Sequence, residues 1–218
     1  MLRPEAGVDR PLPLEIAIPP GRVVVRQGEP SGQLRVLTRG AMLMSAIEPD
    51  GRTLAIDVLG PGDTVGEPGA ASGVEIRALG SCRLRQAPGS PVAQMHLLER
   101  RLERLTRLAC ELAWLDVTDR VDRRLADLAT RFGRPCPGGI SVSLRLTQDD
   151  LAALCGTSRE SANRALRALR ECGRVRVLGR GRYLVRDQES APSAAGSAPV
   201  DVAPPDPSWS STRLHVLQ

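Results

Sequence analysis

The segment LTQDDLAALCGTSRESANRALRALRECGRVRVLGRGRYLVRD, residues 146–187, decides the fold of this 218-residue chain. Its first helix begins after Thr147, whose hydroxyl can cap the helix while Asp150 reaches back in a capping box. Gly156 ends that helix, because glycine adopts a positive φ without a steric cost. Ser158 then caps a second helix. Two helices joined by a short turn that contains glycine predict a helix-turn-helix.

The second helix, residues 159–172, separates apolar from charged side chains. Its apolar face consists, at helical spacing, of Ala162, Ala165, Leu166 and Leu169. Its polar face carries Arg159, Glu160, Asn163, Arg164, Arg167 and Arg170. Residues 174–178 and 182–185 follow as two basic strands around Gly179-Arg180-Gly181, which predicts a β-hairpin. We therefore expect a winged helix-turn-helix.

Positive charge is concentrated in the same part of the chain. The 30 basic residues are all arginine and outweigh 25 acidic residues, which gives a net charge of +5. Residues 135–187 contain ten arginines and five acids, so their net charge of +5 equals that of the whole chain. Such a cluster is expected of a surface that binds a polyanion, although a solvated charged face has the same composition.

Side chains at the start of the second helix suit the edges of base pairs in the major groove. Arg159 and Arg164 can each donate two bonds to guanine, and Glu160 can accept one from cytosine. Phosphate contacts, which fix register without reading sequence, are predicted for Thr147, Gln148, Thr157, Ser158 and the wing residue Arg180. The alternative is that Glu160 and Arg164 form only a surface ion pair, worth ~0.3–0.5 kcal/mol.

Residues 14–89 have the pattern of a small β-barrel or roll, in which short aliphatic runs alternate with turn residues. The predicted strands are 23–25, 34–37, 42–47, 54–59 and 76–84. Asp50-Gly51 lies between two of these runs and favours a tight hairpin, since both residues can reach positive φ.

A long amphipathic helix is predicted over residues 91–116. Its apolar residues follow the spacing of a heptad seam: Met95, Leu98, Leu102, Leu105, Ala109 and Leu112. Such a helix usually pairs with its own copy, so we expect a homodimer; the alternative is a helix that only covers the β domain. A second helix is predicted over 118–131, ended by Gly133 and Pro135. The hinge between the helices falls at Asp116-Val117-Thr118, where an Asp or Thr can cap the new helix.

Composition excludes several classes of protein. No apolar run approaches the ~20 residues of a membrane helix, and the N-terminus has no apolar stretch of a secretory signal. We therefore expect a cytoplasmic protein without membrane contact. Only two histidines, His96 and His215, and five cysteines without a CxxC pair argue against a metal site, and no cofactor is expected. Residues 189–207 have the composition of a disordered extension.

These motifs together resemble the CRP/FNR family of bacterial transcription factors over residues 14–187. In the β region the similar motifs are Gln27-Gly28-Glu29, Arg39-Gly40, Leu59-Gly60-Pro61-Gly62-Asp63 and Gly66-Glu67. Residues 112–118 resemble the hinge of the family. The most specific match is 146–169, with Ser158-Arg159-Glu160 and Arg164, which resembles the recognition element of the cyclic-AMP receptor branch.

The resemblance implies an α+β fold in three parts. These are a jelly-roll-type, cyclic-nucleotide-binding-like β-roll (1–89), a dimerisation helix (90–116) and a winged helix-turn-helix (117–187). Composition adds a disordered tail as a fourth part (188–218). The function implied is that of a transcription regulator and not of an enzyme. A homodimer would bind double-stranded DNA at a palindrome of TGTGA-type half-sites, and activation would involve contact with RNA polymerase.

One departure from the family concerns the effector. Members that bind cyclic nucleotides carry an arginine followed by Ser or Thr after the Gly-Glu pair, and this arginine holds the cyclic phosphate. Here Gly66-Glu67 leads to Arg77-Ala78 without such a pair, and Leu105-Thr106 stands where those members have two hydroxyl residues. Burying a phosphate without its arginine is costly. We therefore expect weak or no binding of cyclic AMP, with Gly66, Glu67 and Thr106 lining any effector pocket.

Three functional hypotheses remain. The first is a DNA-binding regulator that needs no effector, and the second is a regulator gated by an unknown small molecule in the β-roll. The third is a small-barrel metalloenzyme of the cupin type, which is disfavoured because neither histidine lies in the β region.

Overall fold

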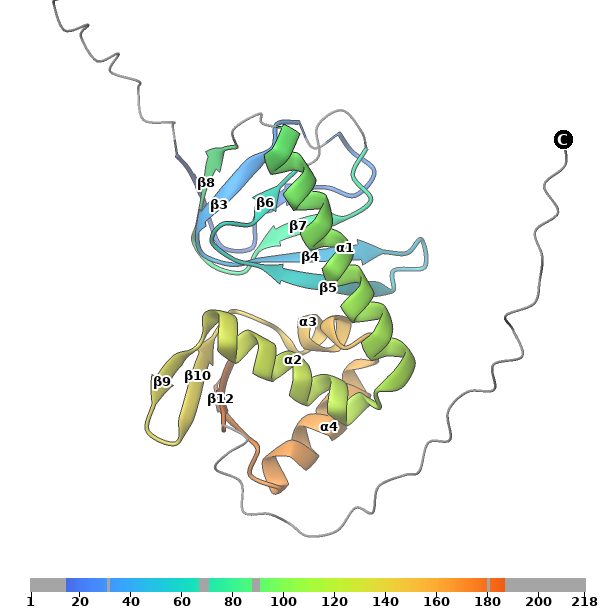
Figure 1. The fold of residues 1–218 in the computed structure, drawn as a ribbon. Helices are drawn as coiled ribbons and strands as arrows, with labels where there is room; N and C mark the ends of the chain where they lie inside the picture. Colours follow the sequence, from blue (N-terminus) through green and yellow to red (C-terminus); the bar gives the residue numbers. More distant parts are fainter. Residues whose placement is uncertain (1–14, 31, 67–70, 88–90, 180, 187–218) are drawn as a thin grey trace, which may run out of the picture.

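The computed structural model describes residues 15–30, 32–66, 71–87, 91–179 and 181–186. Its N-terminal half is a roll of two antiparallel sheets, and its C-terminal half is a helical unit with a third sheet (Figure 1). One sheet of the roll has the order β1 (Ile16–Ile18), β8 (Cys82–Gln86), β3 (Arg35–Arg39), β6 (Thr64–Val65). The other has the order β2 (Val23–Val25), β7 (Glu75–Ala78), β4 (Met42–Ile47), β5 (Thr53–Leu59). The predicted α+β fold is confirmed.

The hairpin between β4 and β5 forms where Asp50-Gly51 predicted it. Gly51 has a φ of +85°, and its N–H donates to the Glu48 carbonyl over 2.9 Å. Four successive residues of β4 are buried, because the strand is covered on both faces. Met42 and Met44 face the interior of the roll, whereas Leu43 joins the core of the helical unit.

The predicted strand 76–84 is wrong, since the structure divides it into β7 and β8. These two strands belong to different sheets, and Leu79, Gly80 and Ser81 carry the chain from one sheet to the other. Ala78 and Leu79 are buried in succession, which breaks the alternation that a single strand with one buried face would show. The Leu79 N–H donates to the Ala41 carbonyl over 2.9 Å and fixes this crossing.

The two long helices are α1 (Pro91–Trp114) and α2 (Val117–Phe132), close to the predicted ranges. The break between the helices lies at Leu115 and Asp116, whereas Val117 and Thr118 of the predicted hinge already belong to α2. The predicted cap is Asp116, whose Oδ1 accepts the Asp119 N–H over 2.9 Å. None of the helices among the described residues combines the length and apolarity that a bilayer span requires.

The C-terminal unit contains α3 (Gln148–Leu154), α4 (Arg159–Glu171) and a sheet in the order β11 (Val175–Gly179), β12 (Arg182–Val185), β10 (Gly139–Ser143), β9 (Arg134–Cys136). The predicted wing hairpin corresponds to β11 and β12. The hairpin of β9 and β10 was not predicted from the sequence. Its prolines and its paired Gly138-Gly139, both with positive φ, gave the segment the composition of a loop.

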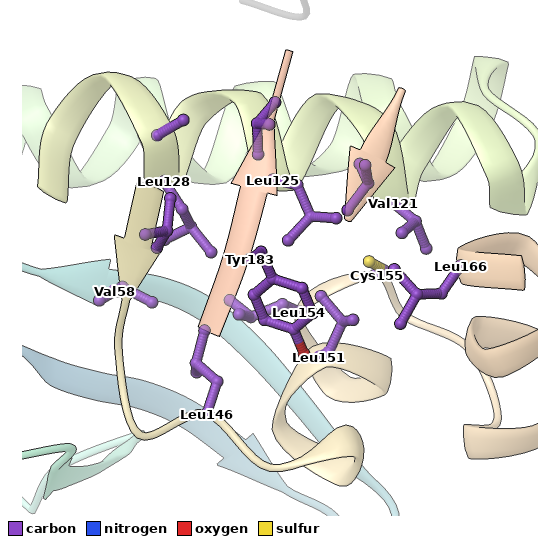
Figure 2. Close-up of a cluster of buried hydrophobic side chains, with 14 of the residues drawn as sticks. Val58, Val121, Leu125, Leu128, Leu146, Leu151, Leu154, Cys155, Leu166 and Tyr183 are labelled. Carbon is purple, nitrogen blue, oxygen red and sulfur yellow. The ribbon is translucent and has the colours of Figure 1, made fainter. Parts of the chain in front are cut away.

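A single apolar core joins the roll to the helical unit. Figure 2 shows Val121, Leu125 and Leu128 of α2 pointing toward Tyr183 of β12 and Leu151 of α3. The members that the roll supplies to this cluster are Ala41, Leu43, Ala55, Val58 and Leu79. The two halves therefore share apolar surface that neither could expose to water without cost.

One of the five cysteines, Cys155, belongs to this shared core. Burial raises the pKa of its thiol to about 12, so the thiol stays protonated at neutral pH. It packs as a small apolar side chain. The predicted tail, residues 188–218, together with Glu67 and Arg180, lies outside the described residues.

We predict that Leu125→Ala lowers the free energy of unfolding by ~2–5 kcal/mol, because it opens a cavity in the apolar core that the roll and the helical unit share. Leu125 is 0% exposed. Urea unfolding followed by circular dichroism measures the change. Arg123→Ala, on the exposed side of the same helix, is the control and should stay within ~0.5 kcal/mol of the unmodified protein. Equal unfolding midpoints for the two variants would contradict the assignment of the core.

Candidate nucleic-acid interface

The N-terminus of α3 is fixed by the predicted capping box. The Thr147 hydroxyl accepts the Asp150 N–H over 3.0 Å, and Asp150 Oδ2 accepts the Thr147 N–H over 2.9 Å. Two N–H groups that a helix N-terminus would leave without partners are thereby satisfied. The first residue of α3, Gln148, is held in a defined position as a result.

The turn between α3 and α4 is built on Gly156, which has a φ of +56°. A Cβ at this position would collide with Leu112 of α1 and touch Leu54 of β5. Close packing and the left-handed backbone conformation therefore both favour glycine here. Ser158 then caps α4, because its hydroxyl accepts the Ser161 N–H over 3.2 Å. The positive φ of Gly156 and the Ser158 cap were both predicted from the sequence.

The recognition helix α4 presents the two faces that the sequence indicated. Its buried residues are Ala162, Ala165, Leu166 and Leu169. The exposed residues include all three predicted base-contacting side chains: Arg159, Glu160 and Arg164. Arg164 donates to the Ser161 hydroxyl over 3.0 Å. Glu160 and Arg164 are both among the described residues, and no ion pair joins them. The surface-pair alternative is therefore not the arrangement seen.

Gln148 links the two helices of the motif. Its Oε1 accepts from Arg159 Nε over 3.4 Å and from Asn163 Nδ2 over 3.3 Å. Arg159 also lies 3.6 Å from a carboxylate oxygen of Asp149. The sequence suggested only a phosphate contact for Gln148, because its neighbours on α4 are 11 and 15 residues away along the chain.

A hollow of about 930 Å³ lies between the start of α3, the exposed side of α4 and the wing. Its lining contains Arg145, Arg159, Arg167 and Arg170. Asp149 is the one carboxylate among the lining residues, so the surface is electropositive. Tyr183 lies at the hollow, and burial raises the pKa of its hydroxyl. Thr147 and Gln148 also line the hollow, whereas the other predicted contact residues that the structure describes do not: Thr157, Ser158, Glu160 and Arg164.

Not every arginine of the basic cluster is available to a ligand. Arg174 is bound to Asp122 of α2, with Nε 3.0 Å from Oδ1, and donates to the Arg186 carbonyl over 3.0 Å. It therefore fastens the wing to α2. On the wing itself, Arg176 and Arg182 are exposed.

Most of the heptad seam on α1 lies at the surface of the single chain. Met95 and Leu98 are each 63% exposed, and Leu102 is 66% exposed. Leu105 and Ala109 are also exposed. Leu112 differs, since it is half-buried against Gly156 of the helix-turn-helix.

The opposite side of α1 attaches the helix to the roll by ion pairs. Arg104 Nε lies 2.9 Å from Asp57 Oδ2, and Arg104 also pairs with Asp63. Arg131 of α2 reaches the same Asp57 over 2.7 Å. These buried carboxylates therefore hold both long helices against the roll.

The residues predicted to line an effector pocket differ in their exposure. Gly66 is buried, whereas Thr106 is exposed on α1. Glu67 is outside the described residues. Arg77 pairs with Asp150 of α3 over 2.6 Å, so its guanidinium is directed at the helical unit. Among the described residues, no group of three or more His, Cys, Asp or Glu side chains could hold a metal ion.

Comparisons with known proteins agree with this architecture. Residues 15–97 match the cyclic nucleotide-binding domain family, and residues 119–190 match the Crp-like helix-turn-helix domain family. The "CRP-like cAMP-activated global transcriptional regulator" of Mycobacterium tuberculosis is 32% identical over 190 residues, which covers 80% of this chain and 84% of that protein. The "CRP-like protein Clp" of Xanthomonas campestris pv. campestris is 34% identical over 180 residues, covering 72% of this chain and 77% of that protein.

Solved structures have the same fold. The c-di-GMP responsive regulator CLP of Xanthomonas campestris superposes with a TM-score of 0.67 at 30% identity, covering 80% of this chain and 94% of that one. A CRP/FNR-family regulator of Thermus thermophilus superposes with a TM-score of 0.70 at 22% identity, covering 81% of this chain and 95% of that one. The chain belongs to the CRP/FNR family of transcription regulators, which are DNA-binding proteins and not enzymes.

Proposed function

We propose that the protein acts as a homodimer that binds a palindrome of two TGTGA-like half-sites. The observation that carries this proposal is the arrangement of Arg159, Glu160 and Arg164 on the exposed face of a capped, packed α4. Arg159 and Arg164 would each pair with a guanine and Glu160 with a cytosine. The domain division proposed from the sequence, with the roll at 1–89, the dimerisation helix at 90–116 and the DNA-binding unit at 117–187, goes with this function.

Phosphate contacts would fix the register of α4 on the duplex. Thr147, Gln148, Thr157 and Ser158 lie around the start of α3 and α4. Arg176 and Arg182 would meet the backbone from the wing, together with the predicted contact of Arg180.

The dimer would form through the exposed row of α1. Large apolar side chains at heptad spacing are rarely left in water over several turns. Pairing two copies of Leu98, Leu102 and Leu105 would bury them and place the two α4 helices about 34 Å apart, one turn of the duplex. A symmetrical protein then requires a symmetrical site.

Regulation by cyclic AMP is proposed to be weak or absent. Arg77 on β7 is the arginine that follows Gly66-Glu67, and it is engaged by Asp150 of α3. A cyclic phosphate in the roll would therefore lack this charge partner. The alternative is gating by another small molecule. One relative is named as cAMP-activated and another is described as c-di-GMP responsive, which makes both nucleotides necessary test ligands. We further propose activation through contact with RNA polymerase, in the cytoplasm where the DNA lies.

Arg164→Ala is expected to cost ~1–3 kcal/mol of binding to the palindrome and to relax the preference at one base pair of each half-site. Fluorescence anisotropy with a series of single-base substitutions measures both effects. Arg182→Ala on the wing is the matched control. It should weaken binding to all sequences alike and lower the slope of affinity against salt by ~1. If Arg164→Ala keeps the full discrimination between palindrome and random duplex, the base assignment is wrong.

Leu102→Glu is expected to convert the dimer to a monomer at micromolar concentration, because it places two carboxylates opposite each other in an apolar seam. Sedimentation velocity measures the change. Glu103→Gln alters the charge of the next residue, outside the seam, by one unit and should leave the dimer intact. As the dimer is lost, the affinity for the palindrome should fall as well. A monomeric unmodified protein would refute the proposed assembly.

Titration calorimetry with cyclic AMP should give no saturable binding in the micromolar range, and added cyclic AMP should leave the affinity for the palindrome unchanged. The same measurements with c-di-GMP test the alternative. Micromolar binding of cyclic AMP coupled to stronger DNA binding would overturn the proposal of effector independence.

A further inference from the structure

Arg77 is directed from the roll to the DNA-binding unit by the alternation of β7. Its neighbours Ile76 and Ala78 are both 0% exposed and face the interior of the roll. Arg77 therefore points to the outer face of the sheet, where α3 lies. Its NH2 group is 2.6 Å from Asp150 Oδ1, with side-chain exposures of 29% for Arg77 and 11% for Asp150. A charge-assisted hydrogen bond in such a partly dry position is one of the stronger polar contacts.

Both oxygens of the Asp150 carboxylate are in use. Oδ1 accepts from Arg77, and Oδ2 accepts the Thr147 N–H of the capping box over 2.9 Å. The same carboxylate thus closes the start of α3 and holds it to the roll. Any displacement of Arg77 would move or weaken the acceptor that orders Thr147 and the next residue, Gln148.

Gln148 carries the connection to the recognition helix. Its Oε1 accepts from Arg159 Nε over 3.4 Å, and it also accepts from Asn163 over 3.3 Å. Polar contacts therefore join Arg77 to Asp150 and Asp150 to Thr147, the peptide bond joins Thr147 to Gln148, and Gln148 contacts Arg159. An arginine side chain has many rotamers, and only a few of them suit contact with a base. An acceptor that holds its Nε in place therefore lowers the conformational entropy lost when the side chain binds a base.

We infer that Arg77 is a positioning residue for DNA recognition, acting from the β-roll through Asp150 and Gln148 on Arg159. It touches no DNA itself in this arrangement. The inference rests on the proposed function, because Arg159 is proposed to contact a base. It adds a role for the roll in sequence discrimination that requires no ligand inside the roll.

The test compares Arg77→Gln with Arg83→Gln. Arg83 lies on β8 of the same roll, is 56% exposed and pairs with Glu15, so its substitution removes the same charge away from α3. Affinities are measured for the palindrome and for a scrambled duplex of the same length at one salt concentration. Arg77→Gln is expected to lower palindrome affinity by about tenfold. Its effect on the scrambled duplex should equal that of Arg83→Gln.

Two further variants separate positioning from general stability. Arg77→Lys keeps the charge and should retain palindrome affinity within about threefold, although it lacks the planar fork. In an Asp150→Ala background, Arg77→Gln should cause no further loss, because the acceptor of the Arg77 hydrogen bond is already removed. Thermal unfolding of every variant fixes a common temperature at which all are folded.

Three results would overturn the inference: Arg77→Gln behaving like Arg83→Gln, equal losses on palindrome and scrambled duplex, or additive losses with Asp150→Ala. Palindrome discrimination by the unmodified protein distinguishes failure of this inference from failure of the proposed function. If it does not discriminate the palindrome, the proposed function fails and the inference with it. If it discriminates and Arg77→Gln does so equally well, only the role of Arg77 is refuted.

Discussion

The packing of α2 against two surfaces at once is the constraint on which the rest of the structure depends. The buried side of this helix, with Val121, Leu125 and Leu128, packs against α4, β10 and β12 of the DNA-binding unit and belongs to the same apolar cluster as Leu43 and Val58 of the roll, which Arg131 of α2 also reaches through Asp57. Because β4 is consequently buried on both faces, its sequence MLMSAI is almost continuously apolar, unlike a strand with one wet face. If the recognition helix changes position, it must therefore either carry the roll with it or expose this apolar surface to water.

Ion pairs connect the same helices and the roll at specific side chains. Asp57 of β5 binds Arg104 of α1 and Arg131 of α2, and Glu111 of α1 lies 2.7 Å from Arg124 of α2 with both side chains buried. Buried pairs of this kind add little net stability, but removal of one partner leaves an uncompensated charge. They consequently join α1 to the roll at Asp57 and to α2 at Arg124.

How far the sequence predicts the structure depends on how far apart the interacting residues are. The capping box of Thr147 and Asp150, the Gly156 turn and the Ser158 cap are local, so their residues alone specified them. Arg77 and Asp150 are 73 residues apart, and Arg174 and Asp122 are 52 residues apart, so no periodicity could pair them. The second contact of Leu112 escaped for the same reason, because heptad spacing ignores the helix-turn-helix that folds back onto the end of α1. The β9–β10 hairpin was missed because β10 also pairs with the distant β12, and this tertiary pairing overrode a local composition of proline and glycine.

The exclusive use of arginine as the cation explains why one residue type can serve both architecture and recognition. A guanidinium offers several donors in a plane, so Arg131 reaches Asp57, Asp127 and the Val58 carbonyl together, and Arg174 spans Asp122 and Arg186. A lysine ammonium is a point charge without this planar fork and could not reproduce such a set. On α4 the same planar donors stay exposed and face no fixed carboxylate other than Asp149 among the described residues. The division between internal and ligand-facing arginines is therefore set by where the acids lie. Asp57, Asp63, Asp122 and Asp127 neutralise the inner set, whereas among the described residues the arginines of α4 have only one contact with an acid, the 3.6 Å ion pair of Arg159 with Asp149, which leaves their charge exposed.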